Sequence, residues 1–143
     1  MKKNKLAFLK IKKEESLGQW LIGQGISAGF PSPADDFKEV RISLDEELVN
    51  NNESTFYARV SGDSMENAGL SDGDLIIIDR SINPENKKIA VCYIDGDFTV
   101  KRIIKRGSKL YLKPENINYK ENELKDGNQL IIWGIVTYVI KQL

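Results

Sequence analysis

Short stretches in which hydrophobic and polar residues alternate, or in which hydrophobic residues run together, recur through residues 40–143. Stretches of this length, bounded by Gly, Pro, Asn and Asp, are typical of β-strands. We therefore predict strands at residues 40–44, 55–61, 74–79, 89–94, 97–104, 109–113 and 130–140. Residues 45–50 and 64–68 favour a helical turn or two. The pattern as a whole predicts a mainly β protein, a compact sheet or barrel with short helices.

The connection between the strands at residues 89–94 and 97–104 carries the clearest local signal. It consists of Asp95 and Gly96, and these residue types tolerate the positive φ that a type I′ turn needs at both central positions. The two strands are therefore expected to pair antiparallel. Along the second strand, one face carries Phe98, Val100, Arg102 and Ile104, and the other carries Thr99, Lys101 and Ile103. Neither face is purely polar.

Residues 1–28 differ from the rest of the chain in charge and in pattern. They carry six lysines against two glutamates, a sum of +6 − 2 = +4, so the other 143 − 28 = 115 residues sum to −4. The segment shows no sustained periodicity and leads through small residues to Pro31 and Pro33. This composition predicts a flexible or extended N-terminal arm, with residues 28–33 extended because proline disfavours helix in the residue before it.

Neither of two hydrophobic runs fits a membrane segment. Lysines interrupt the run at residues 6–11 before it reaches the length of a signal-peptide core, so we predict no export signal. The run at residues 130–140 is far too short to span a bilayer as a helix and is expected to be a buried strand. Trp133 lies within it and is expected in the core.

The composition of the 143-residue chain removes several classes of function. The chain contains no histidine and one cysteine, Cys92, which excludes Ser-His-Asp and Cys-His hydrolases and the usual structural zinc sites. Any catalytic base must be Lys, Asp, Glu, Tyr or the α-amino group. A lone cysteine cannot form an internal disulfide, which favours a reducing, cytoplasmic location, and the apolar strand around Cys92 predicts a buried thiol.

Charge gives little support for a polyanion or a metal as a ligand. A net charge of zero argues against broad electrostatic adhesion to nucleic acid or to anionic membranes. The acidic residues Asp72, Asp74 and Asp79 are interpreted as turn and strand-end residues rather than as metal ligands. We expect no metal and no cofactor.

Residues 60–70 contain the end of a strand, then a glycine and a serine, and then a short potential helix. Gly62 permits a tight backbone approach, and a turn after a strand can expose both the Ser64 hydroxyl and neighbouring backbone N–H groups as an oxyanion site. The alternative is that Asp63 or Ser64 caps the helical turn. Taken alone, the segment favours a cap.

Two further segments indicate a function only when they are considered together with the first. Lys101 stands beside Ile103 on its strand, and a lysine desolvated against a hydrophobic wall has a lowered pKa and can act as general base toward a serine. A solvated lysine is the alternative. Ala28 and Gly29 form a small, extended pair that fits a protease cleft, and an ordinary linker is the alternative.

Together these segments resemble the self-cleaving LexA and UmuD family of serine-lysine peptidases. Ala28-Gly29 followed by Phe-Pro-Ser-Pro is similar to the family's cleavage site, Gly62-Asp63-Ser64-Met65 to its nucleophile motif, residues 72–79 to the strand that follows, and Phe98-Thr99-Val100-Lys101-Arg102 to the strand that carries its lysine. The spacing agrees with the family, with 64 − 28 = 36 positions from Ala28 to Ser64 and 101 − 64 = 37 from Ser64 to Lys101.

The resemblance implies a mechanism and a division of the chain. Ser64 would be the nucleophile, neutral Lys101 the base, and the backbone N–H groups of Asp63 and Ser64 the oxyanion donors. Cleavage between Ala28 and Gly29 would remove a flexible arm, residues 1–28, from a peptidase-like β domain, residues 29–143. Because only 28 residues precede Gly29, no helix-turn-helix domain fits there, and the UmuD-like branch of the family is expected.

The resemblance also implies partners. In the SOS response a RecA filament on single-stranded DNA would stimulate cleavage as a co-protease. The processed homodimer would then serve as an accessory subunit of a UmuC-like, Y-family translesion DNA polymerase. Sequence-specific DNA binding by the chain itself is not implied.

Three other interpretations stay open from the residues. The chain could be a non-catalytic binding module in which Ser64 and Lys101 are structural. It could be a serine-lysine signal peptidase, although the built-in Ala28-Gly29 site and the lack of a membrane anchor argue against this. It could also be the peptidase half of a LexA-type or phage repressor whose DNA-binding domain is encoded elsewhere.

Overall fold

The computed structural model describes residues 7–10, 19–22, 39–124 and 129–143. The chain divides into two compact units, one of residues 12–50 and one of residues 1–11 with residues 51–143. Ala28 and Gly29, the predicted cleavage site, lie outside the described residues. The predicted division after residue 28 concerns cleavage products rather than compact units, and it stays a prediction.

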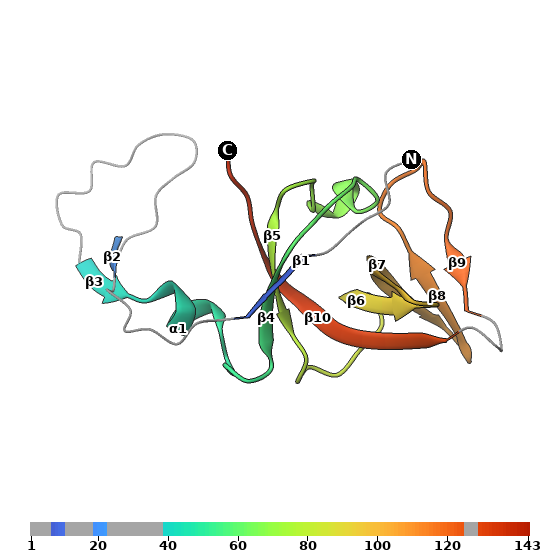
Figure 1. Ribbon diagram of the computed structural model, residues 1–143, viewed down its shortest axis with the longest axis horizontal. Helices are drawn as coiled ribbons and strands as arrows, with labels where there is room; N and C mark the ends of the chain where they lie inside the picture. Colours follow the sequence, from blue (N-terminus) through green and yellow to red (C-terminus); the bar gives the residue numbers. More distant parts are fainter. Residues whose placement is uncertain (1–6, 11–18, 23–38, 125–128) are drawn as a thin grey trace. The chain divides into compact units, whose positions relative to one another are not determined.

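The smaller unit holds a two-stranded antiparallel sheet and a short helix (Figure 1). β2 (Gln19–Ile22) pairs with β3 (Glu39–Ile42), and α1 (Leu44–Leu48) follows. Ser43 caps α1, since its Oγ accepts a hydrogen bond from the N–H of Glu46 at 3.5 Å. The prediction that the strand runs on to residue 44 is therefore wrong, because the cap starts the helix at that position.

The larger unit is built on one eight-stranded antiparallel sheet in the order β1-β4-β5-β10-β6-β7-β8-β9. Its strands are β1 (Ala7–Lys10), β4 (Thr55–Arg59), β5 (Leu75–Asp79), β6 (Ile89–Ile94), β7 (Asp97–Arg106), β8 (Lys109–Lys113), β9 (Asn122–Glu123) and β10 (Leu130–Ile140). One turn of 3-10 helix, η1 (Glu66–Ala68), lies between β4 and β5. The predicted mainly β fold is confirmed. No helix among the described residues is long and apolar enough to cross a membrane.

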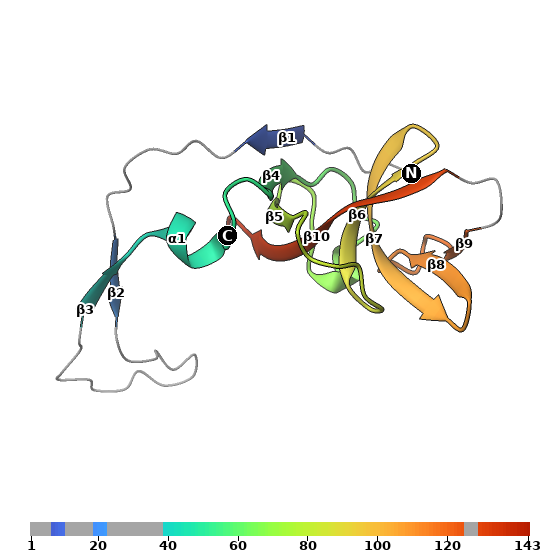
Figure 2. The ribbon, with the colours of Figure 1, turned by 90° about the horizontal axis from the view of Figure 1, so that it is seen from below.

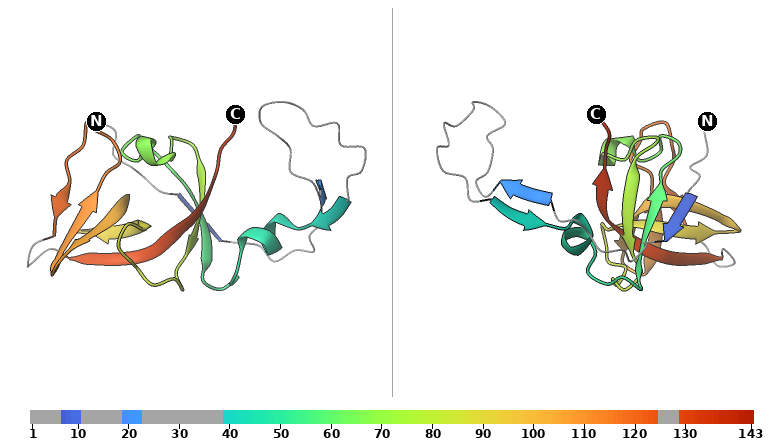
Figure 3. Two further views of the ribbon diagram at one scale, coloured as in Figure 1. Left: turned by 180° about the vertical axis from the view of Figure 1, so that it is seen from behind. Right: turned by 60° about the vertical axis from the view of Figure 1, so that its left-hand side comes forward.

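The long strand β10 joins the two halves of this sheet (Figures 1 and 3). Its first half pairs with β6 and its second half with β5, with Ile135 at the changeover. Gly134 lies at a shift in register, and a Cβ there would stand 2.6 Å from Ile78 Cγ2, so glycine is needed for β10 to pack this closely. The prediction of a buried strand holds for Ile135 but is wrong for Ile131 and for the last residues, Tyr138, Val139 and Ile140, which are all exposed.

β6 and β7 form the predicted hairpin (Figure 2). Asp95 and Gly96 have φ of 46° and 93°, the positive values that the turn requires. Hydrophobic clusters cover both faces of the pair. One contains Ala58, Val60, Met65, Leu70, Ile76, Ile78, Val91 and Val100, and the other contains Ala90, Cys92, Ile103, Leu112 and Ile135. This two-sided burial explains why neither face of β7 is purely polar.

One expectation about a single residue, the burial of Cys92, is confirmed, and that for Trp133 is met in part, because the ring packs against the core but is only partly buried. Cys92 is fully buried, with 0% of its surface exposed. Trp133 packs against the first cluster, with its ring edge-on to those of Phe56 and Phe98 at centroid distances of 5.0 and 6.1 Å. The guanidinium carbon of Arg80 lies over the same ring, 4.5 Å from its centroid.

The sequence pattern missed β1, β2 and β9. β1 and β2 are four-residue strands within the segment predicted to be a flexible or extended arm, where the pattern predicted no paired strand. Stretches this short cannot display a period, and their neighbours are lysines and glycines. β9 is two residues long and owes its strand geometry to pairing with β8.

Candidate active site

Ser64 lies in the segment between β4 and η1, and only 2% of its surface is exposed. Met65, with 1% exposed, anchors this segment in the first hydrophobic cluster. Gly62 has a φ of 95°, a backbone conformation that glycine adopts without strain. The predicted cap is wrong, because the cap position of η1 is Met65 and the described helix has no side-chain cap there.

Lys101 lies in β7, 37 positions after Ser64 in the sequence, and its side chain contacts Ser64. Its Nζ donates to Ser64 Oγ at 3.2 Å, to Thr99 Oγ1 at 2.6 Å and to the Val100 carbonyl at 3.0 Å. The side chain leaves β7 on the face of the second hydrophobic cluster, opposite Ala90. Burial there lowers the pKa of Lys101 to about 8. The structure therefore brings together the serine and lysine singled out in the sequence.

The turn at residues 71–74 holds the backbone that precedes Ser64. Asp72 Oδ1 accepts the N–H of Gly62 at 2.8 Å. Two backbone bonds join the same turn to Val60, one from the Val60 N–H to the Asp74 carbonyl at 2.9 Å and one from the Gly73 N–H to the Val60 carbonyl at 2.8 Å. Asp72 and Asp74 are thus turn residues, as predicted.

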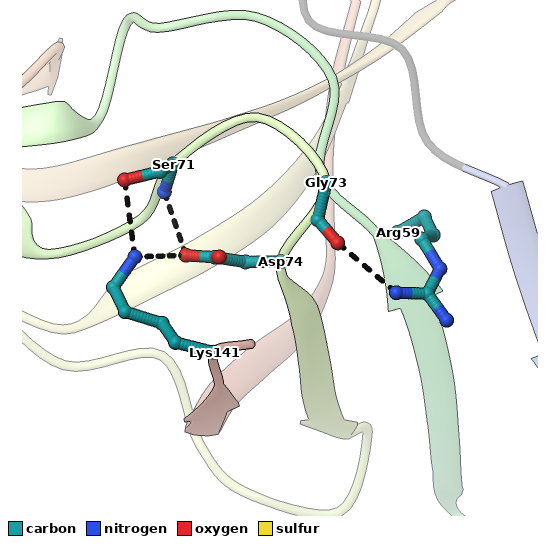
Figure 4. Close-up of polar contacts among 5 residues, drawn as sticks. All are labelled: Arg59, Ser71, Gly73, Asp74 and Lys141. Atoms are coloured by element: carbon teal, nitrogen blue, oxygen red, sulfur yellow. Dashed lines mark hydrogen bonds and ion pairs between the residues drawn. The ribbon is translucent and has the colours of Figure 1, made fainter. Parts of the chain in front are cut away.

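Side chains at the end of β4 and just after β10 secure this turn (Figure 4). Asp74 accepts the N–H of Ser71 at 2.8 Å and forms an ion pair with Lys141, which follows β10. Arg59, at the end of β4, donates to the Gly73 carbonyl at 3.0 Å. Because Asp74 is buried, with 7% of its surface exposed, the ion pair also satisfies a carboxylate that would be costly to leave alone.

A second loop, which follows β8, contacts the residue just before Ser64. Asn116 Nδ2 donates to the Asp63 carbonyl at 2.8 Å, and the Tyr119 hydroxyl donates to the Asp63 carboxylate. The hydrogen bond to Asp63 raises the pKa of Tyr119. The N–H of Asn67, in η1, donates to the Glu115 carbonyl at 2.8 Å. The serine segment is thus held from two sides.

Sequence reasoning did not assign roles to Thr99, Asn116 or Tyr119. Thr99 carried a usable signal, since residues two apart on a strand share a face and Thr99 stands two before Lys101. Asn116 and Tyr119 stand in a loop without hydrophobic periodicity, and only the fold brings that loop to Ser64. Among the described residues, no group of three or more acidic or cysteine side chains is placed to hold a metal ion.

Most of the chain is also similar to known proteins. The model of the family described as Peptidase S24-like matches residues 20–137. Protein ImpA of Salmonella typhimurium is 37% identical over 127 residues, which cover 89% of this chain and 86% of ImpA. Protein MucA of Escherichia coli is 39% identical over 116 residues, 80% of this chain and 79% of MucA. The LexA repressor of Shewanella pealeana is 37% identical over 130 residues, 90% of this chain but 62% of the repressor.

Proposed function

The chain belongs to the Peptidase S24-like family, and from this premise we propose that it is a self-cleaving serine peptidase with Ser64 as nucleophile and Lys101 as general base. One observation carries the proposal, the 3.2 Å contact between Lys101 Nζ and Ser64 Oγ. A serine hydroxyl needs an adjacent base to become a nucleophile, and the chain has no histidine to provide one. A lysine with a pKa of about 8 is partly neutral near neutral pH and can take that role.

The three neighbours of Nζ can accept from a protonated lysine, and they also accommodate a neutral amine. A neutral amine has two hydrogens and one lone pair. The Thr99 hydroxyl and the Val100 carbonyl provide two acceptors for the hydrogens, at 2.6 and 3.0 Å. In the proposed reactive state both hydrogens are used in this way, and the lone pair accepts the Ser64 hydroxyl.

The proposed reaction has two stages. As Ser64 Oγ attacks the Ala28 carbonyl carbon, its proton passes to Lys101, and the backbone N–H groups of Asp63 and Ser64 stabilise the oxyanion. Lys101 returns the proton to the Gly29 nitrogen as the Ala28–Gly29 bond breaks, which leaves residues 1–28 as an ester on Ser64. Water, deprotonated by Lys101, hydrolyses that ester and regenerates both side chains.

The biological setting proposed for this reaction is the SOS response. A tethered substrate has a high effective concentration, so cleavage must be controlled by whether the arm occupies the site. We propose that a RecA filament on single-stranded DNA favours the engaged arm. The processed product, residues 29–143, would act as a homodimer and as an accessory subunit of a UmuC-like translesion DNA polymerase. The similarity to ImpA and MucA supports this branch of the family.

Intact-mass spectrometry tests the dyad directly. Wild type, Ser64→Ala and Lys101→Ala are incubated at neutral and alkaline pH, with and without RecA, single-stranded DNA and a nucleotide that keeps the filament active. Ser108→Ala and Lys105→Ala serve as matched controls, because they remove a serine hydroxyl and a lysine amine at exposed positions. We expect a fragment that begins at Gly29 in wild type and both controls, and none in the two dyad variants.

Two results would count against the proposal. If all five proteins stay intact under every condition, the chain is a binding module rather than a peptidase. If all five are clipped alike, a contaminating protease is responsible. Cleavage that requires Ser64 and Lys101 but ignores the filament would keep the peptidase and remove the RecA-dependent control.

A second candidate is the peptidase part of a LexA-type repressor, which the match to the LexA repressor supports. This candidate has the same dyad and the same cleavage site. It differs in its consequence, since cleavage would inactivate a DNA-binding protein. Fluorescence anisotropy of labelled duplex DNA, with a protein that supplies the DNA-binding domain, distinguishes it from the polymerase role.

A further inference from the structure

The peptide bond between Asp63 and Ser64 links the Asp63 carbonyl, which accepts two hydrogen bonds, to the Ser64 N–H, a proposed oxyanion donor. The bond is trans, so the Asp63 carbonyl and the Ser64 N–H lie in one plane and point in opposite directions. Asn116 Nδ2 donates to that carbonyl at 2.8 Å, and the N–H of Glu66 donates to it at 3.2 Å. Whatever fixes the carbonyl therefore also fixes the direction of the Ser64 N–H.

The Asn116 amide is itself held in the orientation this contact needs. Its Oδ1 accepts the N–H of Asn118 at 3.0 Å, which leaves Nδ2 as the end that faces Asp63. The backbone carbonyl of Asn116 accepts the N–H of Tyr119 at 3.1 Å and closes the turn. The donor is therefore built into a short, internally bonded loop rather than carried on a free side chain.

The same loop is tied to the strand that carries the lysine. Glu115 forms an ion pair with Arg102, the residue after Lys101 on β7. The Glu115 carbonyl accepts the N–H of Asn67, two residues beyond Met65. The loop thus contacts β7 through Glu115 and contacts the segment around Ser64 through Glu115, Asn116 and Tyr119.

We propose that Asn116 is a positioning residue for catalysis, which sets the plane of the Asp63–Ser64 peptide so that the Ser64 N–H is aimed at the oxyanion. The inference rests on the proposed function, since it presumes that Ser64 forms the oxyanion intermediate. A donor that is aimed before the reaction begins lowers the barrier without reorganisation during it. Asn116 does not touch the reacting atoms and acts only through this peptide.

The test compares self-cleavage rates from pH 6 to pH 11 in four full-length variants. Asn116→Asp keeps the acceptor toward Asn118 and loses the donor, while Asn116→Ala loses both without adding charge. Tyr119→Phe deletes a contact from the same loop to the Asp63 carboxylate and leaves the carbonyl bond intact. Asn118→Ala truncates an exposed neighbour and keeps its backbone N–H. Circular dichroism checks that each variant is folded at the assay temperature.

Removal of a whole oxyanion donor slows a peptidase by about 100-fold to 1,000-fold, so loss of its aim is expected to slow cleavage by about 10-fold to 100-fold. We expect this fall in both Asn116 variants at every pH, with the midpoint of the Asn116→Ala pH profile unchanged because Lys101 is untouched. Tyr119→Phe should fall less, and Asn118→Ala should match wild type.

Several results would overturn the positioning role. Equal slowing by Tyr119→Phe and Asn116→Ala would mean that the loop merely supports the fold. A shifted pH midpoint in Asn116→Ala would place the effect on Lys101 instead. Wild-type rates in both Asn116 variants would remove the positioning role and leave the peptidase intact. If wild type itself is never cleaved, the proposed function fails, and the positioning role fails with it.

Discussion

Lys101 and Cys92 lie on the same face of the β6–β7 hairpin, diagonal to each other, because Lys101 stands opposite Ala90 and Cys92 opposite Thr99. The second hydrophobic cluster covers this face. Burial there lowers the pKa of Lys101 to about 8 and raises that of Cys92 to about 12. One hydrophobic environment therefore brings the titration of the amine closer to neutral pH and holds the thiol in its neutral form, which links the packing of β6 to the chemistry proposed at Ser64.

The first prediction concerns the pH dependence of self-cleavage. The rate should rise with pH as Lys101 loses its proton, with a midpoint near pH 8, and should level off above it. An unperturbed lysine would give a midpoint about two units higher, near 10.4. First-order rates from intact mass between pH 6 and pH 11 measure the pH dependence.

Lys101→Arg should be inactive throughout, because a guanidinium keeps its proton in this range, while Lys105→Arg should follow wild type. A flat profile or a midpoint near 10 would contradict the role of burial.

The second prediction concerns stability, measured in a Ser64→Ala background so that the chain stays intact. The folded pKa of Lys101 lies below its unfolded value, so the unfolded state binds more protons between pH 8 and pH 10.5, and stability should rise with pH across that window. Lys101→Met should therefore increase the free energy of unfolding at pH 7, by about 1–2 kcal/mol after a discount for partial exposure and lost hydrogen bonds.

Urea titrations at pH 7 and pH 11 check the sign. The advantage of Lys101→Met should be present at pH 7 and should shrink at pH 11, where lysine is neutral in both states. Lys105→Met, on the exposed part of β7, should change stability by less than about 0.5 kcal/mol at either pH. A loss of stability in Lys101→Met at pH 7 would mean that the hydrogen bonds of Nζ outweigh its desolvation.

The sequence predicted most of the fold because the strands that matter are long and bounded by clear turns. The ends of β6, β8 and β10 coincide with the predicted ranges, and the Asp95-Gly96 turn has the predicted backbone. β7 extends two residues further than predicted, since pairing with β8 continues through Arg106. Strands as short as β1 and β9 carry no period and depend on a neighbour that sequence alone does not identify.

The candidate site was predictable only in part, for a similar reason. Ser64 and Lys101 stand in segments with their own local signals, a glycine turn after a strand and an apolar strand. Asn116 and Asp72 form hydrogen bonds with the backbone of Asp63 and Gly62, respectively. Every residue has a backbone carbonyl and nearly every residue a backbone N–H, so the residue types do not reveal such a pair. Long-range contacts of this kind require the fold.

The third prediction concerns Cys92, the one thiol of the chain. It is fully buried with a raised pKa, so the native protein should react with a disulfide reagent at pH 8 only as fast as the second cluster opens. Absorbance of the released thiolate measures the rate. Ser108→Cys, in the exposed turn before β8, should label at once and provides the positive control. Immediate labelling of wild type would show that the face that desolvates Lys101 admits solvent.

The fourth prediction concerns the close approach of β10 and β5. In Gly134→Ala the new methyl group would meet Ile78 Cγ2 at 2.6 Å and Arg80 Cγ at 3.3 Å. Ile78 is fully buried and cannot move aside, so the variant should lose about 1–3 kcal/mol of unfolding free energy by urea titration. Ile78→Ala removes the opposing atom and leaves a cavity, at a cost of about 2–5 kcal/mol by itself. The double variant should lose less than the sum, since the added methyl enters the space that Ile78 vacates. Additive losses would mean that the backbone of β10, rather than the Ile78 side chain, sets the need for glycine.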